Sequence, residues 1–199
     1  MSASTRSWSR PWAAVQILLC GLLLSACASP AARYYRLQTD ALSSPAQTGA
    51  GPVVQIGPVA LPAWLNRPQL VRDEGAGRVT LLARTEWAAP LPQLIAESLA
   101  QGVGAQLGWS QVQAWPSVSP YAADWVVTLD VRDLTAAENS VRLDASWRVM
   151  RAGQLLASGA LKREVALSGQ DADAIVAAHD QALSELASAI ASSLRSIAR

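Results

Sequence analysis

Two neighbouring stretches of the sequence, DWVVTLDVRDL (residues 124–134) and SVRLDASWRVM (residues 140–150), decide the fold class. In both, large apolar residues alternate with polar or smaller ones. This period of two is typical of a strand that buries one face and leaves the other in water. The residues expected to face the core are Trp125, Val127, Leu129 and Val131 in the first stretch and Val141, Leu143, Ala145, Trp147 and Val149 in the second.

The opposite face of these two strands carries charges of both signs. Asp130 and Arg132 lie on it in the first strand, and Arg142, Asp144 and Arg148 lie on it in the second. Two carboxylates on adjacent strands could serve general acid–base chemistry. Because arginines accompany them, we favour a cross-strand ladder of ion pairs instead.

The same reading predicts further strands on either side. Residues 33–38 (RYYRLQ) and 53–61 (VVQIGPVAL) are candidate strands, and Pro58 predicts that the second is an edge strand or contains a bulge. Residues 75–77, Gly-Ala-Gly, predict the turn of a hairpin. A further strand is expected to return after Gly153, again in a hairpin.

Two segments change to helical spacing. The first, PLPQLIAESLAQGVGAQLG (residues 90–108), forms an apolar stripe, and Gly108 is expected to end that helix. The second, about residues 171–197, has acidic residues in its first turn and Arg195 near its end, which suits the helix dipole. The order β-rich, helix, β-rich, helix predicts a single α+β domain. We expect a mostly antiparallel sheet with the two main helices packed on one face.

The N-terminal residues have the composition of a cleaved export signal. Arg6 and Arg10 precede an apolar run from Ala13 to Ala26. That run is shorter than the roughly 20 residues that a membrane-spanning helix needs. A basic start, a short apolar core and small residues before a cut site are typical of a secretory signal peptide. We therefore expect residues 1–26 to be removed.

The end of this signal, Leu24-Ser25-Ala26-Cys27, resembles the lipobox of bacterial lipoproteins. The resemblance implies that Cys27 is acylated and becomes the first residue of the mature chain. Two or three acyl chains anchor a protein stably, whereas one chain holds it only marginally. The alternative is an ordinary secretory signal that leaves Cys27 as a free thiol.

The residue after Cys27 bears on the choice of membrane. In enterobacterial lipoproteins an aspartate at that position retains the protein at the inner membrane, and this chain has Ala28 instead. The resemblance therefore implies the outer membrane, with the protein facing the periplasm. Residues 27–33 would form the acylated cysteine and a short tether, and residues 34–199 a single periplasmic domain.

The sequence offers little support for catalysis or metal binding. His179 is the only histidine, and no cysteine follows residue 27, so a zinc site or a catalytic triad would lack partners. We expect His179 at the surface or at the boundary of the core. The 16 basic and 15 acidic residues give a net charge of +1 and are interspersed, so no nucleic-acid-binding surface is expected. We predict a non-enzymatic protein without metal or cofactor.

The turn LPAWLNRP (residues 61–68) is the strongest candidate for a binding surface. It contains Trp64 and Arg67, two residue types that are enriched in binding hot spots. No strand or helix period requires Trp64 to be buried. The alternative, that Trp64 closes an edge of the core, is equally compatible with the sequence.

Two motifs resemble a known family. IGPVALPAWLNRPQLV (residues 56–71) and RTEWAAPL (residues 84–91) resemble segments of the auxiliary lipoproteins of ABC-type intermembrane transporters, the group that includes paraquat-inducible protein C. There, a V-x-L-P-x-x-L-x-R-P-Q-[IL]-V stretch is followed by a hairpin and a W-[AG]-x-P-L helix start. The matching residues are Val59, Leu61, Pro62, Leu65, Arg67, Pro68, Gln69, Leu70 and Val71 in the first motif and Trp87, Ala88, Pro90 and Leu91 in the second.

This resemblance implies a function at the cell envelope. Members of the family are non-enzymatic outer-membrane lipoproteins that work with proteins containing MCE (mammalian cell entry) domains. With an inner-membrane permease and ATPase, such assemblies move lipids or other hydrophobic molecules between the two membranes. The chain would be the docking subunit at the outer membrane, and a homo-oligomeric ring is plausible. The expected partner-binding residues are Trp64, Leu65, Asn66, Arg67, Pro68 and Trp87.

Two other functions remain open from the sequence. A periplasmic carrier would hold a lipid or another hydrophobic ligand between helix and sheet, which requires an apolar cavity of a few hundred Å³. A hydrolase has the least support, because no catalytic constellation is evident.

Overall fold

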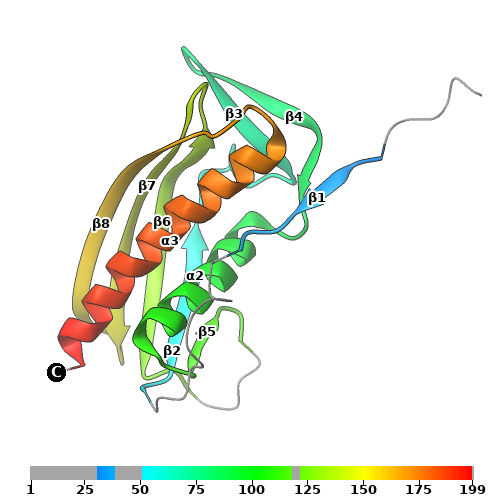
Figure 1. The fold of residues 1–199 in the computed structure, drawn as a ribbon. Coiled ribbons are helices and arrows are strands. Elements are labelled where there is room, and N and C mark those ends of the chain that lie inside the picture. The colour runs from blue at the N-terminus through cyan, green and yellow to red at the C-terminus, as the bar shows by residue number, and fades with distance from the viewer. Residues whose placement is uncertain (1–30, 39–50, 118–121, 199) are drawn as a thin grey trace, which may run out of the picture. The chain divides into compact units, whose positions relative to one another are not determined.

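The computed structural model describes residues 31–38, 51–117 and 122–198, and Figure 1 shows how their elements are arranged. The predicted signal peptide, residues 1–26, and the predicted acylation site, Cys27, lie outside these residues. The strands are β1 (Arg33–Tyr35), β2 (Val54–Ala60), β3 (Gln69–Gly75), β4 (Arg78–Trp87), β5 (Val112–Ala114), β6 (Trp125–Ala136), β7 (Ser140–Arg151) and β8 (Gln154–Ala166), and the helices are α2 (Leu91–Leu107) and α3 (Ala172–Ile197).

The central strands β6 and β7 have the predicted alternation. Their inward series is buried on one face of the sheet, and the intervening residues are half-buried or exposed. The register of β6 shifts between Val131 and Asp133, which marks Arg132 as the extra residue of a bulge. Beyond the bulge the inward series continues one position later, at Leu134. Trp125 and Trp147 are both in the core, as predicted.

The sheet is mixed, which corrects the expectation of a mostly antiparallel one. Among the described strands, the pairings β1–β4, β2–β5, β2–β6 and β3–β6 are parallel, and β3–β4, β6–β7 and β7–β8 are antiparallel. The antiparallel pairs are the hairpins, whose short turns leave a mark in the sequence. The parallel pairs join strands that are distant in the chain and require long crossovers. Local patterning therefore reveals the first kind of pairing and not the second.

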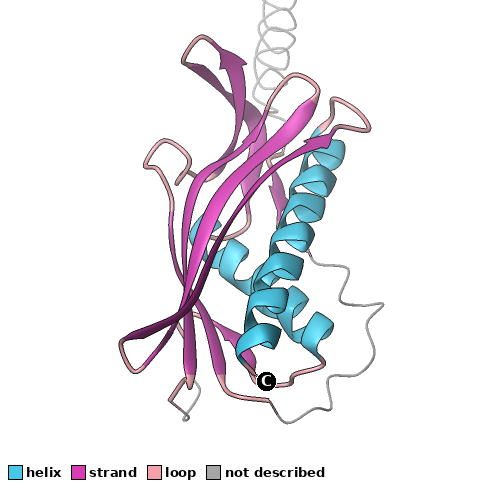
Figure 2. Ribbon diagram, turned by 90° about the vertical axis from the view of Figure 1, so that its left-hand side faces the viewer, coloured by secondary structure: helices cyan, strands magenta, loops and turns pink. Residues whose placement is uncertain are grey.

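Both helices cover the same face of the sheet, as predicted, and Figure 2 shows this layer from the side. Helix α3 packs on β7 and β8, and α2 packs on β2, β5 and α3. The carboxylate of Asp171 accepts a hydrogen bond from the backbone N–H of Ala174, 2.8 Å away, and so caps α3. Helix α2 ends at Gly108, whose φ of 69° is left-handed, as its predicted stop requires.

Two details of the strands differ from the sequence interpretation. Strand β5 was not predicted, because three residues are too few to show a period. Strand β2 has a shift in register between Ile56 and Val59, which confirms the bulge expected around Pro58. However, β2 lies between β5 and β6 and is not an edge strand. No helix of the described residues is long and apolar enough to span a membrane.

The contact between Trp147 and Gly159 joins the sheet to α3. The two residues are paired across β7 and β8, and the indole N–H of Trp147 donates to the hydroxyl of Ser193 on α3 at 3.2 Å. A Cβ atom added to Gly159 would lie far inside van der Waals distance of the indole ring. Only glycine therefore leaves room for this ring between the strand and the helix.

We expect Gly159→Ala to lower the free energy of unfolding by about 1–3 kcal/mol, because a rigid ring in a packed core has little freedom to move. The measurement is urea unfolding followed by tryptophan fluorescence. Ser158→Ala is the matched control, because Ser158 is exposed on the next position of the same strand. Equal stabilities of the two variants would contradict the packing argument.

Candidate functional site

A surface pocket of about 370 Å³ lies where the turn after β2 meets the end of β4 and the start of α2. Its lining comes from two segments that are about twenty positions apart in the chain. The lining residues are Asn66, Arg67, Pro68, Trp87, Ala89 and Pro90. The structure thus brings together four of the six residues predicted to bind a partner.

The turn that forms one wall of the pocket is held by its own hydrogen bonds. The backbone N–H groups of Leu65 and Asn66 donate to the carbonyl of Pro62 at 2.9 and 3.1 Å. The Nε of Arg67 donates to the carbonyl of Trp64 at 3.2 Å. Leu65 is 1% exposed, so its side chain is buried beneath the turn and is not available to contact a partner.

Trp87 joins the pocket to the core. Its backbone N–H donates to the carbonyl of Pro68 at 2.7 Å, which fastens the turn to the end of β4. Its ring is almost fully buried and meets the ring of His179 on α3 edge-on, with centroids 5.6 Å apart. Trp87 therefore lines the pocket and also links the pocket to α3 through its contact with His179.

The rim turn, residues 64–67, exposes three polar or aromatic side chains, of which Asn66 and Arg67 line the pocket and Trp64 does not. Trp64 retains 37% of its surface, so it does not close the core completely, and Asn66 and Arg67 are exposed as well. Within the described parts of the chain, no carboxylate forms an ion pair with Arg67. An apolar floor beside an unpaired guanidinium suits a partner segment that combines an apolar side chain with a carboxylate.

His179 is buried, which corrects its expected place at the surface or at the boundary of the core. It is 2% exposed, and its Nδ1 lies 2.8 Å from the carbonyl oxygen of Ile175, one helical turn earlier. Burial lowers the pKa of His179 below its ordinary value of 6.5, against the opposite effects of hydrogen bonds to the backbone and of the charge of Asp133. The ring is therefore a neutral packing element beneath Trp87.

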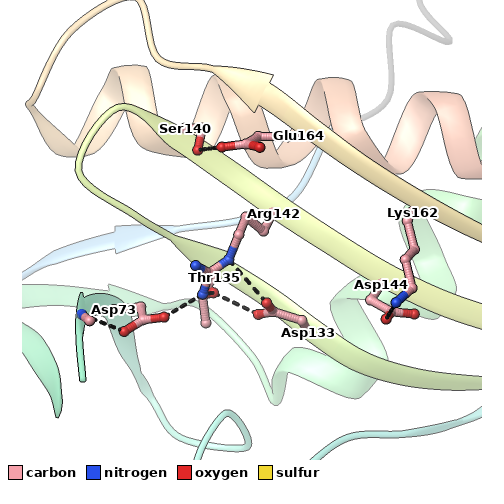
Figure 3. A network of polar contacts seen from close by, with 9 residues as sticks. Asp73, Asp133, Thr135, Ser140, Arg142, Asp144, Lys162 and Glu164 are labelled. Carbon is pink, nitrogen blue, oxygen red and sulfur yellow. Dashed lines mark hydrogen bonds and ion pairs between the residues drawn. The ribbon is translucent and has the colours of Figure 1, made fainter. Parts of the chain in front are cut away.

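The charged face of the sheet forms the predicted ladder of ion pairs, part of which Figure 3 shows. Arg142 bridges Asp73 of β3 and Asp133 of β6, with its Nε 3.2 Å from the Asp133 carboxylate. Asp144 pairs with Arg132 and with Lys162, the latter at 3.0 Å. The hydrogen bond from Arg142 lowers the pKa of Asp73, and the one from Arg132 lowers the pKa of Asp144.

This ladder does not have the character of a catalytic site. A general acid would need a raised carboxylate pKa, whereas the shifted carboxylates here have lowered ones. No group of three or more His, Cys, Asp or Glu residues in the described chain could hold a metal ion. The ladder instead ties the end of β3 to β6 and β7 on the face that the helices leave open.

Comparison with known proteins places the fold among solved structures. The model superposes on the crystal structure of an uncharacterized protein with a TM-score of 0.68 and 20% identity, over 83% of this chain and 99% of the other. A protein from Xanthomonas campestris gives a TM-score of 0.61 and 15% identity, over 79% and 92%. No curated protein matches the chain. The class is thus an α+β domain whose mixed sheet carries two helices on one face.

The family follows from the sequence itself. The model of the ABC-type transport auxiliary lipoprotein component matches residues 35–191. The chain belongs to this family, as its motifs predicted, and is a lipoprotein that serves as an auxiliary component of ABC-type transport.

Acid is expected to destabilise the protein through His179. The pKa of His179 is lower in the folded chain than in the unfolded chain. Below about pH 6.5 the unfolded chain therefore binds a proton at this residue, whereas the folded chain does not. The free energy of unfolding should be constant above that pH and fall below it, by up to about 1.4 kcal/mol per pH unit. Urea unfolding between about pH 7.5 and about pH 5 measures this slope.

His179→Gln is the control variant, because glutamine does not titrate. Its stability should change less than the wild-type stability over the same range. The lowered pKa values of Asp73 and Asp144 remove stability only at lower pH, below their ordinary value of 3.8. A wild-type protein whose stability is as flat as that of the variant would contradict the buried neutral histidine.

Proposed function

We propose that the chain is the docking subunit of an ABC-type intermembrane transport system at the outer membrane. Cys27 would carry the acyl anchor, and the domain would face the periplasm. Its partner would be a periplasmic protein with an MCE domain, linked to an inner-membrane permease and ATPase. The cargo would be a lipid or another hydrophobic molecule, and the transport would serve the integrity of the envelope.

The pocket between Arg67 and Trp87 is the observation that supports docking. It is built from the two segments whose motifs identify the family, Arg67 in its lining is exposed, and the exposed Trp64 precedes Arg67 by three residues in the same turn. Hot spots of protein interfaces commonly combine such residues with an apolar pocket. Its position on the surface leaves it accessible to a segment of another protein.

The packing between helices and sheet argues against a carrier. A carried acyl chain would need an apolar cavity there. In the described structure this space holds side chains that are less than 2% exposed, among them Ile175, Leu183, Leu186, Ile190 and Leu194 of α3. Docking therefore accounts for the structure better than carriage does.

We expect Trp64→Ala and Arg67→Ala each to weaken binding of the MCE-domain partner by about tenfold or more, because each removes a rim contact of the hot-spot type. Isothermal titration with the periplasmic part of the MCE protein encoded nearest to this gene measures the effect. Both side chains are exposed, so the variants should stay folded with at most a small loss of thermal stability, which for Arg67→Ala comes from the hydrogen bond between its Nε and the carbonyl of Trp64.

The controls separate binding from folding. Trp115→Ala and Arg151→Ala change an exposed tryptophan and an exposed arginine elsewhere and should leave the affinity unchanged. Leu65→Ala should instead lower the free energy of unfolding by about 2–4 kcal/mol, because it empties a buried site. Unchanged affinity of both rim variants would overturn the proposed docking site.

Acylation at Cys27 has its own test. The mature protein purified from membranes should begin at residue 27 and exceed the mass of the unmodified chain by its acyl groups, because a single thiol anchor requires them for stable attachment. Cys27→Ser should leave the chain unacylated. A mature protein with a free Cys27 thiol would refute the anchor and favour an ordinary secretory signal.

A further inference from the structure

The β3–β4 hairpin exposes apolar side chains near its tip. Figures 1 and 2 show that this hairpin projects past the other strands at one end of the sheet. Val79 and Leu81 are 46% and 40% exposed. They are two residues apart in β4 and so point to the same side. Aliphatic side chains at the tip of a projecting hairpin indicate a surface that meets something less polar than water.

The exposed side of the hairpin is the side without helices. Val79 is paired with Asp73, whose carboxylate joins Arg142 in the ladder on the open face of the sheet. The next residue, Arg72, points the other way, and its guanidinium donates to the carbonyl of Gln170, close to the start of α3, at 3.2 Å. The two apolar side chains therefore have no covering layer in the described structure.

Strand β1 places the attachment of the tether at the same end of the molecule. It runs parallel to β4, with Arg33 beside Thr85 and Tyr34 beside Glu86. Because β4 starts at the hairpin tip, the Arg33 end of β1 is the end nearer to the tip along β4, with the bend at Arg84, whose φ is 58°, between them. Tyr34 is 66% exposed and adds an aromatic side chain of the kind that is enriched at membrane interfaces.

The lengths of the tether and the hairpin agree. Cys27 precedes Arg33 by six residues, which span at most about 20 Å when fully extended. Val79 precedes Thr85, the partner of Arg33, by six residues as well, so at most about 20 Å of chain separates the two, and less because β4 bends at Arg84. A membrane anchored through Cys27 thus lies within reach of the hairpin tip.

The charge near the tip suits an anionic surface. Arg33, Arg78 and Arg84 are exposed, and basic side chains next to anionic lipid strengthen the attachment to a membrane. Of the acidic residues of the hairpin, Asp73 is paired with Arg142, and Glu86 accepts a hydrogen bond from Gln69. Glu74, next to the tip, is also exposed, so the three arginines outnumber the exposed acidic residue of the hairpin tip.

We propose that the open side of the β3–β4 hairpin, with Val79, Leu81 and Tyr34, rests on the bilayer in which the chain is anchored, and that anionic phospholipid strengthens this contact. The inference rests on acylation at Cys27, which is part of the proposed function. It also has a consequence for docking. Strand β3 runs from Gln69, next to the pocket, to Gly75 at the tip. The contact would therefore hold the pocket about 20 Å from the membrane surface, the length of that strand.

The test uses the full mature chain with its acyl anchor, reconstituted in vesicles of phosphatidylethanolamine and phosphatidylglycerol. A fluorescent label is attached to Leu81→Cys or, as the matched control, to Leu155→Cys. Leu155 is also an exposed leucine near a hairpin turn, but it is paired with Met150 at the far end of the sheet. Quenching by iodide in the water and by a nitroxide-bearing lipid in the membrane is measured for both.

We expect the label at position 81 to be quenched several-fold less by iodide and more by the nitroxide lipid than the label at position 155. The difference should shrink in vesicles of phosphatidylcholine alone. Equal quenching of the two labels on a chain that mass spectrometry shows to be acylated would overturn the contact and leave the anchor and the docking site standing. Protection at position 81 that arises only when the MCE-domain partner is added would overturn it in favour of a protein interface. An unacylated chain that stays in solution would overturn the anchor and the contact together.

Discussion

Burial of the inner face of β6 is the constraint on which the rest of the structure depends. This strand pairs with β7, which follows it in a hairpin, and with β2 and β3 from the first half of the chain, so distant parts of the sequence meet on it. Its inward side chains, Trp125, Val127, Leu129 and Val131, are at most 7% exposed. Burying each such side chain contributes about 1.5–3 kcal/mol, and both helices cover the face to which they belong. A shift of one residue in the register of β6 would turn this series outward and place Asp130 and Arg132 in the core.

The same constraint explains what the sequence can and cannot predict. Alternation in β6 and β7 and the turn at Gly75 to Gly77 are local, so the long strands and hairpins follow from the residues alone. The parallel pairing of β2 with β6 joins residues about seventy positions apart and has no local signature. His179 was misplaced for a related reason: its environment comes from Trp87, which only the folded chain brings beside it. For the site, the motifs identify the turn and Trp87, but only the structure distinguishes the exposed Arg67 from the buried Leu65.

The shape of the proposed docking pocket depends on the core. One wall is the turn before β3. The hydrogen bond from the backbone N–H of Trp87 to the carbonyl of Pro68 holds this turn in place, and the ring of Trp87 packs edge-on against the ring of His179 on α3. A partner that moved Trp87 would also disturb the packing of α3 on the sheet. Because packed cores resist small displacements, the pocket should be preformed, and binding should lose little conformational entropy. The buried neutral histidine suits this role, since a charged ring would attract water into the same space.

The ion pairs on the open face of the sheet can then be explained by the hairpin that they hold. A hairpin that projects from a sheet is held only at its base, and exposed pairs alone contribute little to stability. Arg142, however, joins Asp73 near the tip of β3 to Asp133 of β6 and so ties the hairpin to the central strand of the sheet. A braced hairpin can set a distance, whereas a loose one cannot. If its tip rests on the membrane, the brace converts a flexible lipid tether into a fixed height and orientation for the pocket, which is what the proposed docking to a periplasmic partner requires.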